Sequence, residues 1–123
     1  MTDEIRLGRT GSVAVITLNA PQRRNAFVPE MVKSLIATCD EVDGDSTVGA
    51  VVIRAEGESF CSGAHRELLA AAGLDPAHPL NYERLGLTYR AFVRVGELRV
   101  PTVAAVRGHV VGAGVNLMLA ADL

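Results

Sequence analysis

Two short apolar runs, each followed at once by a loop of small residues, constrain the fold of this chain more than any other feature. Residues 50–53 lead into the loop 58–65, and residues 102–106 lead into the loop 107–116. A continuous apolar run of this length with polar flanks predicts a strand that is covered on both faces, as in a parallel sheet. Helical periodicity lies before and between these runs, so the order of elements predicts an α/β fold with mainly parallel pairing.

The N-terminal elements follow from periodicity and turn residues. Short strands are predicted at 5–7 and 13–18 on either side of a turn at 8–12, followed by a loop at 19–25. A helix is expected to begin at Pro29, where the first turn tolerates proline, and to end within 43–45. Its apolar residues recur at helical spacing and form one stripe: Val32, Leu35, Ile36, Cys39 and Val42.

The second half of the chain contains more helix. A short helical piece is predicted at 68–72, and the prolines at 76 and 79 predict an irregular stretch over 73–79. An amphipathic helix is expected before Pro101, marked by Leu85, Tyr89, Phe92, Val93 and Gly96. The last predicted helix, 113–121, has few polar residues and is expected to need cover on all sides.

Composition excludes several kinds of partner. The 123 residues suit a single domain, and with 49% hydrophobic but only 4% aromatic residues its core must be aliphatic. A formal net charge of −2, without a cluster of basic residues, argues against nucleic acid. No apolar run approaches the ~20 residues of a membrane span, and no signal peptide is expected at Met1–Glu4. We therefore predict a cytoplasmic protein in which Cys39 and Cys61 are reduced thiols.

Backbone amides in the two small-residue loops are the first candidate site. Parallel strands end at one edge of the sheet, where open α/β folds bind ligands. If the two strands are neighbours, the N–H groups of Ala64 and Ala113 can point into one space and form an oxyanion hole for a carbonyl oxygen. Two unrelated tight turns whose small residues serve packing would give the same pattern, so the residues alone leave both interpretations open.

The sequence gives little support to a dinucleotide-binding site or to a catalytic serine. The triplet Gly112–Gly114 lacks a third small residue at Leu117, which a dinucleotide fingerprint would need. Ser59 and Ser62 do not lie in a Gly-x-Ser-x-Gly motif, so a nucleophile elbow is not predicted.

The polar candidates are few. His65, His78 and His109 lack metal-ligand spacing, so no metal is predicted, and His65 is expected to be a solvated loop residue. The pair Arg23–Arg24 suits either one phosphate group or a solvated surface. Asn116 lies beside the candidate oxyanion hole and can donate or accept hydrogen bonds, but it cannot carry a proton at neutral pH.

Four motifs in order resemble one family. They are Ile16–Pro21 with Arg24–Ala26, Phe60–Ala64, Pro101–Gly108, and Gly112–Gly114 with Leu119–Asp122. Together they resemble the enoyl-CoA hydratase/isomerase (crotonase) family. The resemblance implies that residues 1–123 are the N-terminal part of a single crotonase-like domain, an α/β spiral of ββα units that is incomplete at the C-terminus. It also implies assembly into a homotrimer or hexamer and an acyl-CoA thioester as substrate, with no further cofactor.

The resemblance also assigns roles by matched position. Ala64 and Ala113 correspond to the two oxyanion-hole donors, which polarise the thioester carbonyl and stabilise an enolate. The remaining residues implied to bind substrate lie in these two loops and in the segment 23–26: Arg23, Arg24, Asn25, Ala26, Ser62, Gly63, His65 and Gly112.

Three departures from the family pattern limit the expected activity. Asn116 stands where hydratases carry a catalytic glutamate, and His65 stands where the family usually has aspartate. A second family glutamate would lie beyond Leu123. We therefore expect this chain alone to be inactive and the longer parent to be an enzyme, with isomerisation at least as well supported as hydration. A non-catalytic acyl-CoA-binding or oligomerisation module of the same fold is the alternative, and an unrelated α/β phosphate binder would require all four motif matches to be accidental.

Overall fold

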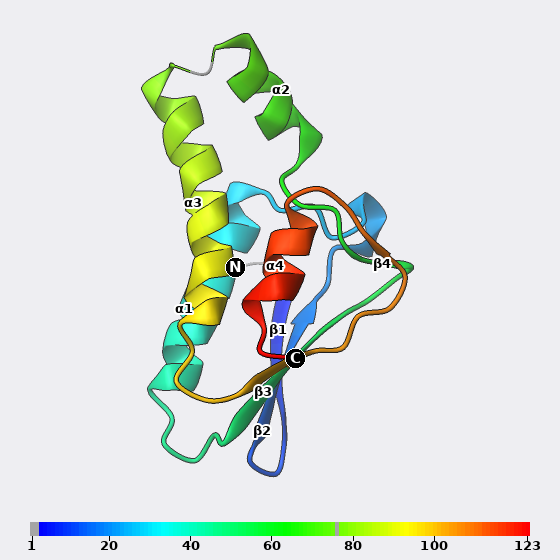
Figure 1. Cartoon of the computed structure of the whole chain (residues 1–123), viewed down its shortest axis with the longest axis vertical. Coiled ribbons are helices and arrows are strands. Elements are labelled where there is room, and N and C mark those ends of the chain that lie inside the picture. Colours follow the sequence, from blue (N-terminus) through cyan, green and yellow to red (C-terminus); the bar gives the residue numbers. More distant parts are fainter. Residues whose placement is uncertain (1–2, 76) are drawn as a thin grey trace.

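The computed structural model describes residues 3–75 and 77–123 (Figure 1). Pro76, one of the two prolines expected to exclude regular structure, lies outside the described residues, as do Met1 and Thr2. The elements in chain order are β1 (Ile5–Thr10), β2 (Val13–Leu18), the 3-10 turn η1 (Pro21–Arg23), α1 (Pro29–Asp43), β3 (Ala50–Ala55), β4 (Ser59–Cys61), α2 (Arg66–Leu74), α3 (Pro79–Gly96), β5 (Thr102–Ala104), β6 (His109–Val110) and α4 (Gly114–Ala120).

The strands form one sheet of order β1-β2-β3-β5 and a separate small pair, β4-β6. β1 and β2 are antiparallel, whereas β2 with β3, β3 with β5, and β4 with β6 are parallel. The mainly parallel α/β arrangement is therefore confirmed. Since β3 and β5 are neighbours, the loops that follow them leave the sheet at the same edge.

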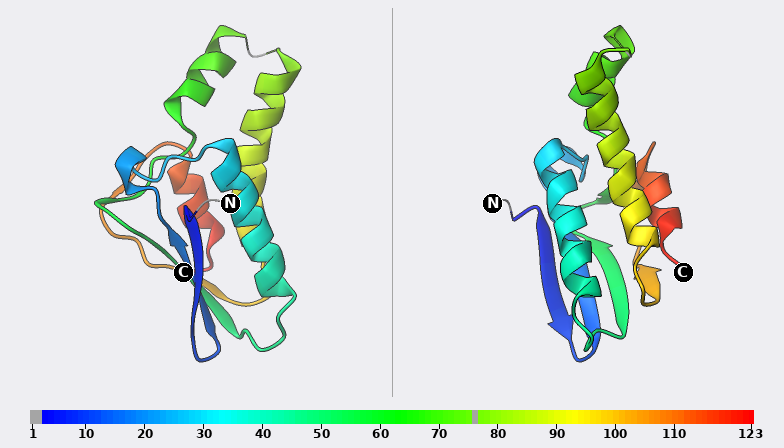
Figure 2. Two further views of the ribbon diagram at one scale, coloured as in Figure 1. Left: turned by 180° about the vertical axis from the view of Figure 1, so that it is seen from behind. Right: turned by 90° about the vertical axis from the view of Figure 1, so that its left-hand side faces the viewer.

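One face of the sheet forms the core. Register places Ile16 opposite Ile53, and Ala14 opposite Val51, so that their buried side chains point to the same side. The stripe predicted for α1 packs there, and α3 lies beside α1 (Figure 2). The rings of Phe27 and Phe92 meet edge to face with centroids 5.3 Å apart. α2 and the first half of α3 extend away from this core as a helical hairpin (Figure 1).

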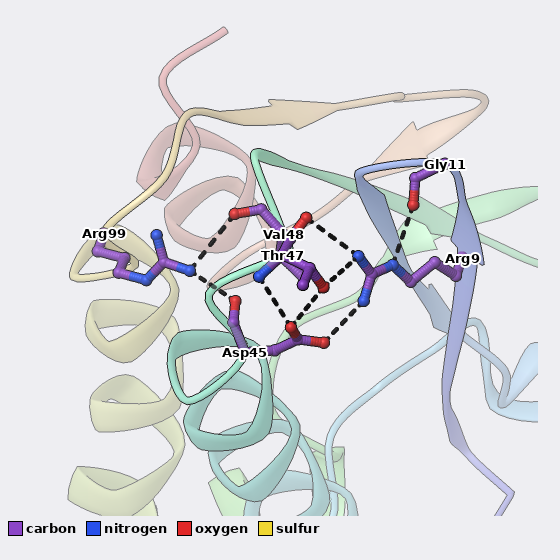
Figure 3. A network of polar contacts seen from close by, with 6 residues as sticks. All are labelled: Arg9, Gly11, Asp45, Thr47, Val48 and Arg99. Carbon is purple, nitrogen blue, oxygen red and sulfur yellow. Dashed lines mark hydrogen bonds and ion pairs between the residues drawn. The ribbon is translucent and has the colours of Figure 1, made fainter.

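The opposite end of the sheet, where β2 and β3 begin, is held by two arginines (Figure 3). The Arg9 guanidinium donates to the Asp45 carboxylate at 2.7 Å and to the hydroxyl and carbonyl of Thr47 at 2.6 and 3.0 Å. Arg99 donates to the carbonyls of Asp45 and Val48 at 2.6 and 3.3 Å. The loop from α1 to β3 is thereby attached to the β1–β2 hairpin and to the connection after α3.

Several predicted boundaries were wrong. β1 continues to Thr10, and only two residues turn the hairpin, because Gly11 adopts a φ of +60° that reverses the chain sharply. Pro79 does not lie in an irregular stretch but begins α3, where the first helical position needs no N–H donor. The helical piece at 68–72 is part of the longer α2.

The strand predicted at 102–106 ends at Ala104, and it is less covered than expected. Val103 and Val106 are 38% and 39% exposed, whereas Thr102 is buried. β4 and β6 were not predicted at all. They span three and two residues and lie inside what the sequence presents as loops, so neither is long enough to show a period of two.

Candidate active site

The two small-residue loops lie directly against each other. The Val111 N–H donates to the Cys61 carbonyl at 3.0 Å, next to the pairing of β4 with β6. A Cβ built on Gly63 would lie only 2.8 Å from the Ala113 nitrogen, and one built on Gly114 would overlap the Cys61 carbonyl. Small residues are therefore needed here because two backbones approach closely, as the loop composition indicated.

The backbone on either side of Ala64 is held by two hydrogen bonds to Phe27. The Phe27 N–H donates to the Gly63 carbonyl at 2.6 Å, and the His65 N–H donates to the Phe27 carbonyl at 2.9 Å. Because successive amides in extended chain point to opposite sides, the Ala64 N–H points away from Phe27. Among the residues that the structure describes, this N–H donates to no protein acceptor.

Ala113 immediately precedes α4 and also has an unused amide. Within the described part of the chain its N–H finds no acceptor, whereas those of Gly114, Val115 and Asn116 donate to the carbonyls of Val111, Gly112 and Ala113. The first amides of α4 are thus already bonded. The available donor is the amide of Ala113, one residue earlier.

A cavity of about 1000 Å³ opens beside Ala64, a size typical of ligand sites. The predicted site residues that line it are Arg23, Arg24, Ala26, Ser62, Ala64 and His65. Gly63, Gly112, Ala113, Asn25 and Asn116 are not among its described lining residues. Ala113 lies against Gly63, next to Ala64, and Val111 lines the cavity. Arg66 and His109 also line it, and neither was predicted.

The two neighbouring arginines differ in what they can bind. The Arg23 guanidinium forms a two-pronged ion pair with Glu4 at 2.6 and 2.7 Å and donates to the Ala26 carbonyl at 2.7 Å. Hydrogen bonding from Arg23 holds the pKa of the Glu4 carboxyl below its usual value. The guanidinium of Arg24 has no polar partner among the described residues, although its carbonyl accepts the Ser62 hydroxyl at 2.8 Å. Arg24 is therefore the cation of this pair that is available to a ligand.

Asn25 is a structural tether between three loops. Its side chain is 0% exposed, accepts the Ala20 N–H at 2.7 Å, and donates to the carbonyls of Glu56 and Ser59 at 3.0 and 2.9 Å. All of its amide atoms are thus engaged within the protein. The backbone at Arg24 and Asn25 has a φ of 57° at both positions, which turns adjacent side chains in different directions.

The Cys61 side chain forms hydrogen bonds that stabilise the turn at Gly63. Its sulfur accepts the Gly63 N–H at 3.3 Å and donates to the Asn25 carbonyl at 3.5 Å. Burial raises the pKa of the Cys61 thiol to about 11, so the group stays protonated at neutral pH and is a poor nucleophile. Cys39 is a second buried free thiol, located in α1.

His65 is not the solvated loop residue that we expected. It is half-buried at the entrance of α2, where its Nδ1 accepts the Glu67 N–H at 3.2 Å as a helix cap. Asn116, in the first turn of α4, is exposed and its side chain has no polar partner among the described residues. Within residues 3–75 and 77–123, no group of three or more His, Cys, Asp or Glu residues is placed to hold a metal ion.

Solved structures define the class of this fold. An enoyl-CoA hydratase from Polaromonas sp. JS666 superposes with a TM-score of 0.86 at 28% identity, covering 97% of this chain and 46% of that one. An enoyl-CoA hydratase/isomerase from Xanthobacter autotrophicus Py2 gives a TM-score of 0.85 at 33% identity, covering 100% and 45%. The chain therefore has the crotonase fold, as an incomplete spiral of ββα units.

The family is equally clear. The model of the enoyl-CoA hydratase/isomerase family matches residues 8–123, so the chain belongs to that family. It is 45% identical over 121 residues to a probable enoyl-CoA hydratase of Mycobacterium tuberculosis, covering 98% of this chain and 46% of that protein. It is 42% identical over 113 residues to a putative enoyl-CoA hydratase of Thermus thermophilus, covering 92% and 44%. The chain thus spans less than half the length of these relatives. In its described part, no helix has both the length and the apolar character needed to cross a bilayer.

Proposed function

We propose that this chain carries the thioester-binding part of an acyl-CoA site. The amides of Ala64 and Ala113 donate to the thioester oxygen and stabilise the enolate that forms when a proton leaves the adjacent carbon. The observation that supports the proposal is the close approach of Gly63, the residue before Ala64, to the Ala113 nitrogen, together with the lack of an acceptor for either alanine amide among the described residues.

The coenzyme A portion lies in the cavity, where Arg24 contacts a phosphate group. The guanidinium of Arg24 has no polar partner in the described part of the chain, whereas that of Arg23 is paired with Glu4. Arg23, Asn25 and Ala26 therefore contribute by shaping the loop. Ser62, Gly63 and Gly112 contribute through backbone that lies close to the thioester. The thioester is the substrate, and no further cofactor is proposed.

The reaction proposed for the longer protein uses a single base. Asn116 occupies the position of a family glutamate but cannot exchange a proton, so this chain lacks one of the two carboxylates that handle water in a hydratase. Double-bond isomerisation is therefore at least as well supported as hydration, and this chain by itself is proposed to be inactive.

We place the protein in the cytoplasm, as a homotrimer or hexamer, by resemblance to the family.

A non-catalytic acyl-CoA-binding or oligomerisation module is the second candidate. The same asparagine favours it, because an oxyanion hole without a base binds a thioester without turning it over. Both candidates predict that the protein binds the thioester. Only the enzyme is expected to exchange the α-protons of a bound acyl-CoA with deuterium from the solvent, and this is measured on the longer protein.

Calorimetric titration with acetoacetyl-CoA and with free coenzyme A tests the site. Ala113→Pro removes one donor, and the φ of −64° at this position already suits proline. Since a hydrogen bond to a charged group contributes about 1.5–3 kcal/mol, acetoacetyl-CoA should bind about 10- to 100-fold more weakly, with coenzyme A unaffected. Ala113→Ser keeps the amide and serves as the control. An equal loss for both ligands, no loss at all, or no binding by the folded protein would refute the proposal.

A further inference from the structure

The cavity beside Ala64 contains more than one cation without a partner. Three arginines are among its described lining residues, and the guanidinium of Arg23 is already paired with Glu4. The guanidinium groups of Arg24 and Arg66 have no polar partner in the described part of the chain. Since the function proposed above uses Arg24 for a phosphate group of coenzyme A, Arg66 is a cation in the cavity without an assigned ligand.

Arg66 lies close to the candidate oxyanion hole. It is the first residue of α2 and follows Ala64 by two positions. Leu69, three residues further on and therefore on the same face of the helix, also lines the cavity. The loop of Arg24 contacts the chain on the other side of Ala64, through the hydroxyl of Ser62. We therefore assign α2 to the acyl side of the thioester and the loop of Arg24 to the coenzyme A side.

Few carboxylates surround this part of the cavity. Glu58 is the one carboxylate among the described lining residues, and β4 separates it from Ala64. His65 and Asn116 stand where the family pattern has aspartate and glutamate, so neither position carries a negative charge. Both replacements remove the repulsion that a negatively charged acyl group would meet beside the oxyanion hole. The surroundings of Ala64 therefore suit an acyl group that carries a carboxylate of its own.

A carboxylate on the acyl group also changes how the enolate can form. Asn116 cannot take a proton from the α carbon. A carboxylate bonded to that carbon can instead leave as carbon dioxide, and the electron pair of the broken carbon–carbon bond passes into the enolate. This step needs donors for the enolate oxygen and no base.

We propose that the site takes a 2-carboxyacyl thioester of coenzyme A, such as malonyl-CoA, and releases its carboxylate as carbon dioxide. Arg66 binds the carboxylate and selects this substrate, while the amides of Ala64 and Ala113 hold the thioester oxygen as the enolate forms. A proton from water then converts the enolate into the acyl-CoA, and the remaining hydroxide combines with carbon dioxide to give bicarbonate. The inference rests on the function proposed above, because it uses the same oxyanion hole.

Calorimetric titration with three ligands tests the role of Arg66. Malonyl-CoA and acetoacetyl-CoA have acyl groups of similar size but differ in the carboxylate, and free coenzyme A has no acyl group. Arg66→Met should weaken the binding of malonyl-CoA about 10- to 100-fold, the typical effect of losing a hydrogen bond to a charged group, and leave the other two ligands unaffected. Arg66→Lys keeps the charge and should retain most of the affinity. Arg90→Met is the matched control, because this exposed arginine of α3 is not among the described residues that line the cavity.

The ligand that loses affinity identifies the anion that Arg66 binds. An equal loss for all three ligands would place Arg66 on a phosphate group of coenzyme A and overturn the proposal, as would an unchanged affinity for malonyl-CoA. If acetoacetyl-CoA binds and malonyl-CoA does not, this inference fails while the proposed function stands. If no thioester binds to the folded protein, the proposed function fails and this inference fails with it.

The release of carbon dioxide is measured on the longer protein. Malonyl-CoA labelled with carbon-13 in its carboxylate should give, in deuterium oxide, labelled bicarbonate and acetyl-CoA with deuterium at the α carbon, both detected by NMR. Ala113→Pro should slow this reaction about 100- to 1000-fold, the known effect of losing one oxyanion donor, and Arg90→Met should not slow it. A rate no higher than that in buffer, or a rate that Ala113→Pro leaves unchanged, would overturn the proposal.

Discussion

Replacing Asn25 tests how the site is held together. Its buried side chain joins Ala20, Glu56 and Ser59, three positions brought together by folding. Asn25→Gly removes all three hydrogen bonds while keeping a residue that adopts the observed φ of 57° without strain. Ser59 begins β4, so the tether also positions the strand that leads to the Gly63 turn.

The expected loss follows from these contacts. Each of the two bonds to a carbonyl contributes about 1 kcal/mol net, and the Ala20 amide, which is buried, costs about 1–3 kcal/mol when it is left without a partner. Asn25→Gly should therefore lower the free energy of unfolding by about 3–5 kcal/mol. Asn25→Ala should lose about 0.5–1 kcal/mol more, because the left-handed conformation disfavours a Cβ by more than glycine loses in chain entropy.

Urea unfolding followed by circular dichroism measures both values, provided that the slope of the transition stays constant among the variants. Asn19→Ala is the matched control, since this side-chain amide makes one hydrogen bond within the described residues, to the Asp3 carbonyl at 3.1 Å, and should contribute about 1 kcal/mol or less. A loss below about 1 kcal/mol in Asn25→Gly, or an alanine variant more stable than the glycine variant, would refute the tether.

Two further predictions concern close packing and buried thiols. Gly108→Ala should prevent stable folding, because Gly108 has a φ of +75° and a Cβ there would overlap the Glu58 carbonyl. Gly73→Ala in α2 is the control, since its Cβ would meet no atom within 4 Å. Thermal unfolding should show that this second variant is as stable as the wild type or more stable. Burial raises the pKa of Cys61 to about 11 and that of Cys39 to about 12, so the unfolded chain loses these protons first as the pH rises. Stability should decline from the ordinary thiol pKa toward pH 11, and a variant with Cys39→Ala and Cys61→Ala that shows the same alkaline decline would contradict this.

The long elements were predictable because their periodicity extends over several turns or residues. The stripe that begins at Val32 predicted α1, and the largely apolar run at 13–18 predicted β2 with the correct bounds. β4 and β6 were not predictable, since each is defined by its partner across the loop rather than by its own pattern. Pro79 was misinterpreted because a proline that ends regular structure and one that begins a helix look the same until the following helix is located.

The approach of the two small-residue loops was predictable from the sequence, but the positions of the surrounding side chains were not. The small residues that follow two parallel strands predicted that the loops of Ala64 and Ala113 would lie close together. No local signal showed that Arg23 pairs with Glu4, which lies nineteen residues away along the chain. The cap formed by His65 had one signal, an acidic residue in the following turn, but histidine is not among the usual capping residues.

The segment 23–26 shows why backbone positions are easier to predict than side-chain positions, because its adjacent side chains lie in different surroundings. Arg23 points to Glu4, Arg24 lines the cavity with no polar partner for its guanidinium among the described residues, and Asn25 is buried, although the three residues are consecutive. A backbone amide is placed by the course of the chain, so a motif that preserves the fold preserves the donor whatever the side chain is. A side chain is placed by the groups that surround it, and two consecutive residues with positive φ send it in directions that the sequence does not specify. The positions of the Ala64 and Ala113 amides therefore follow from the course of the chain, whereas the positions of the side chains of Arg23, Arg24, His65 and Asn116 have to be established one by one.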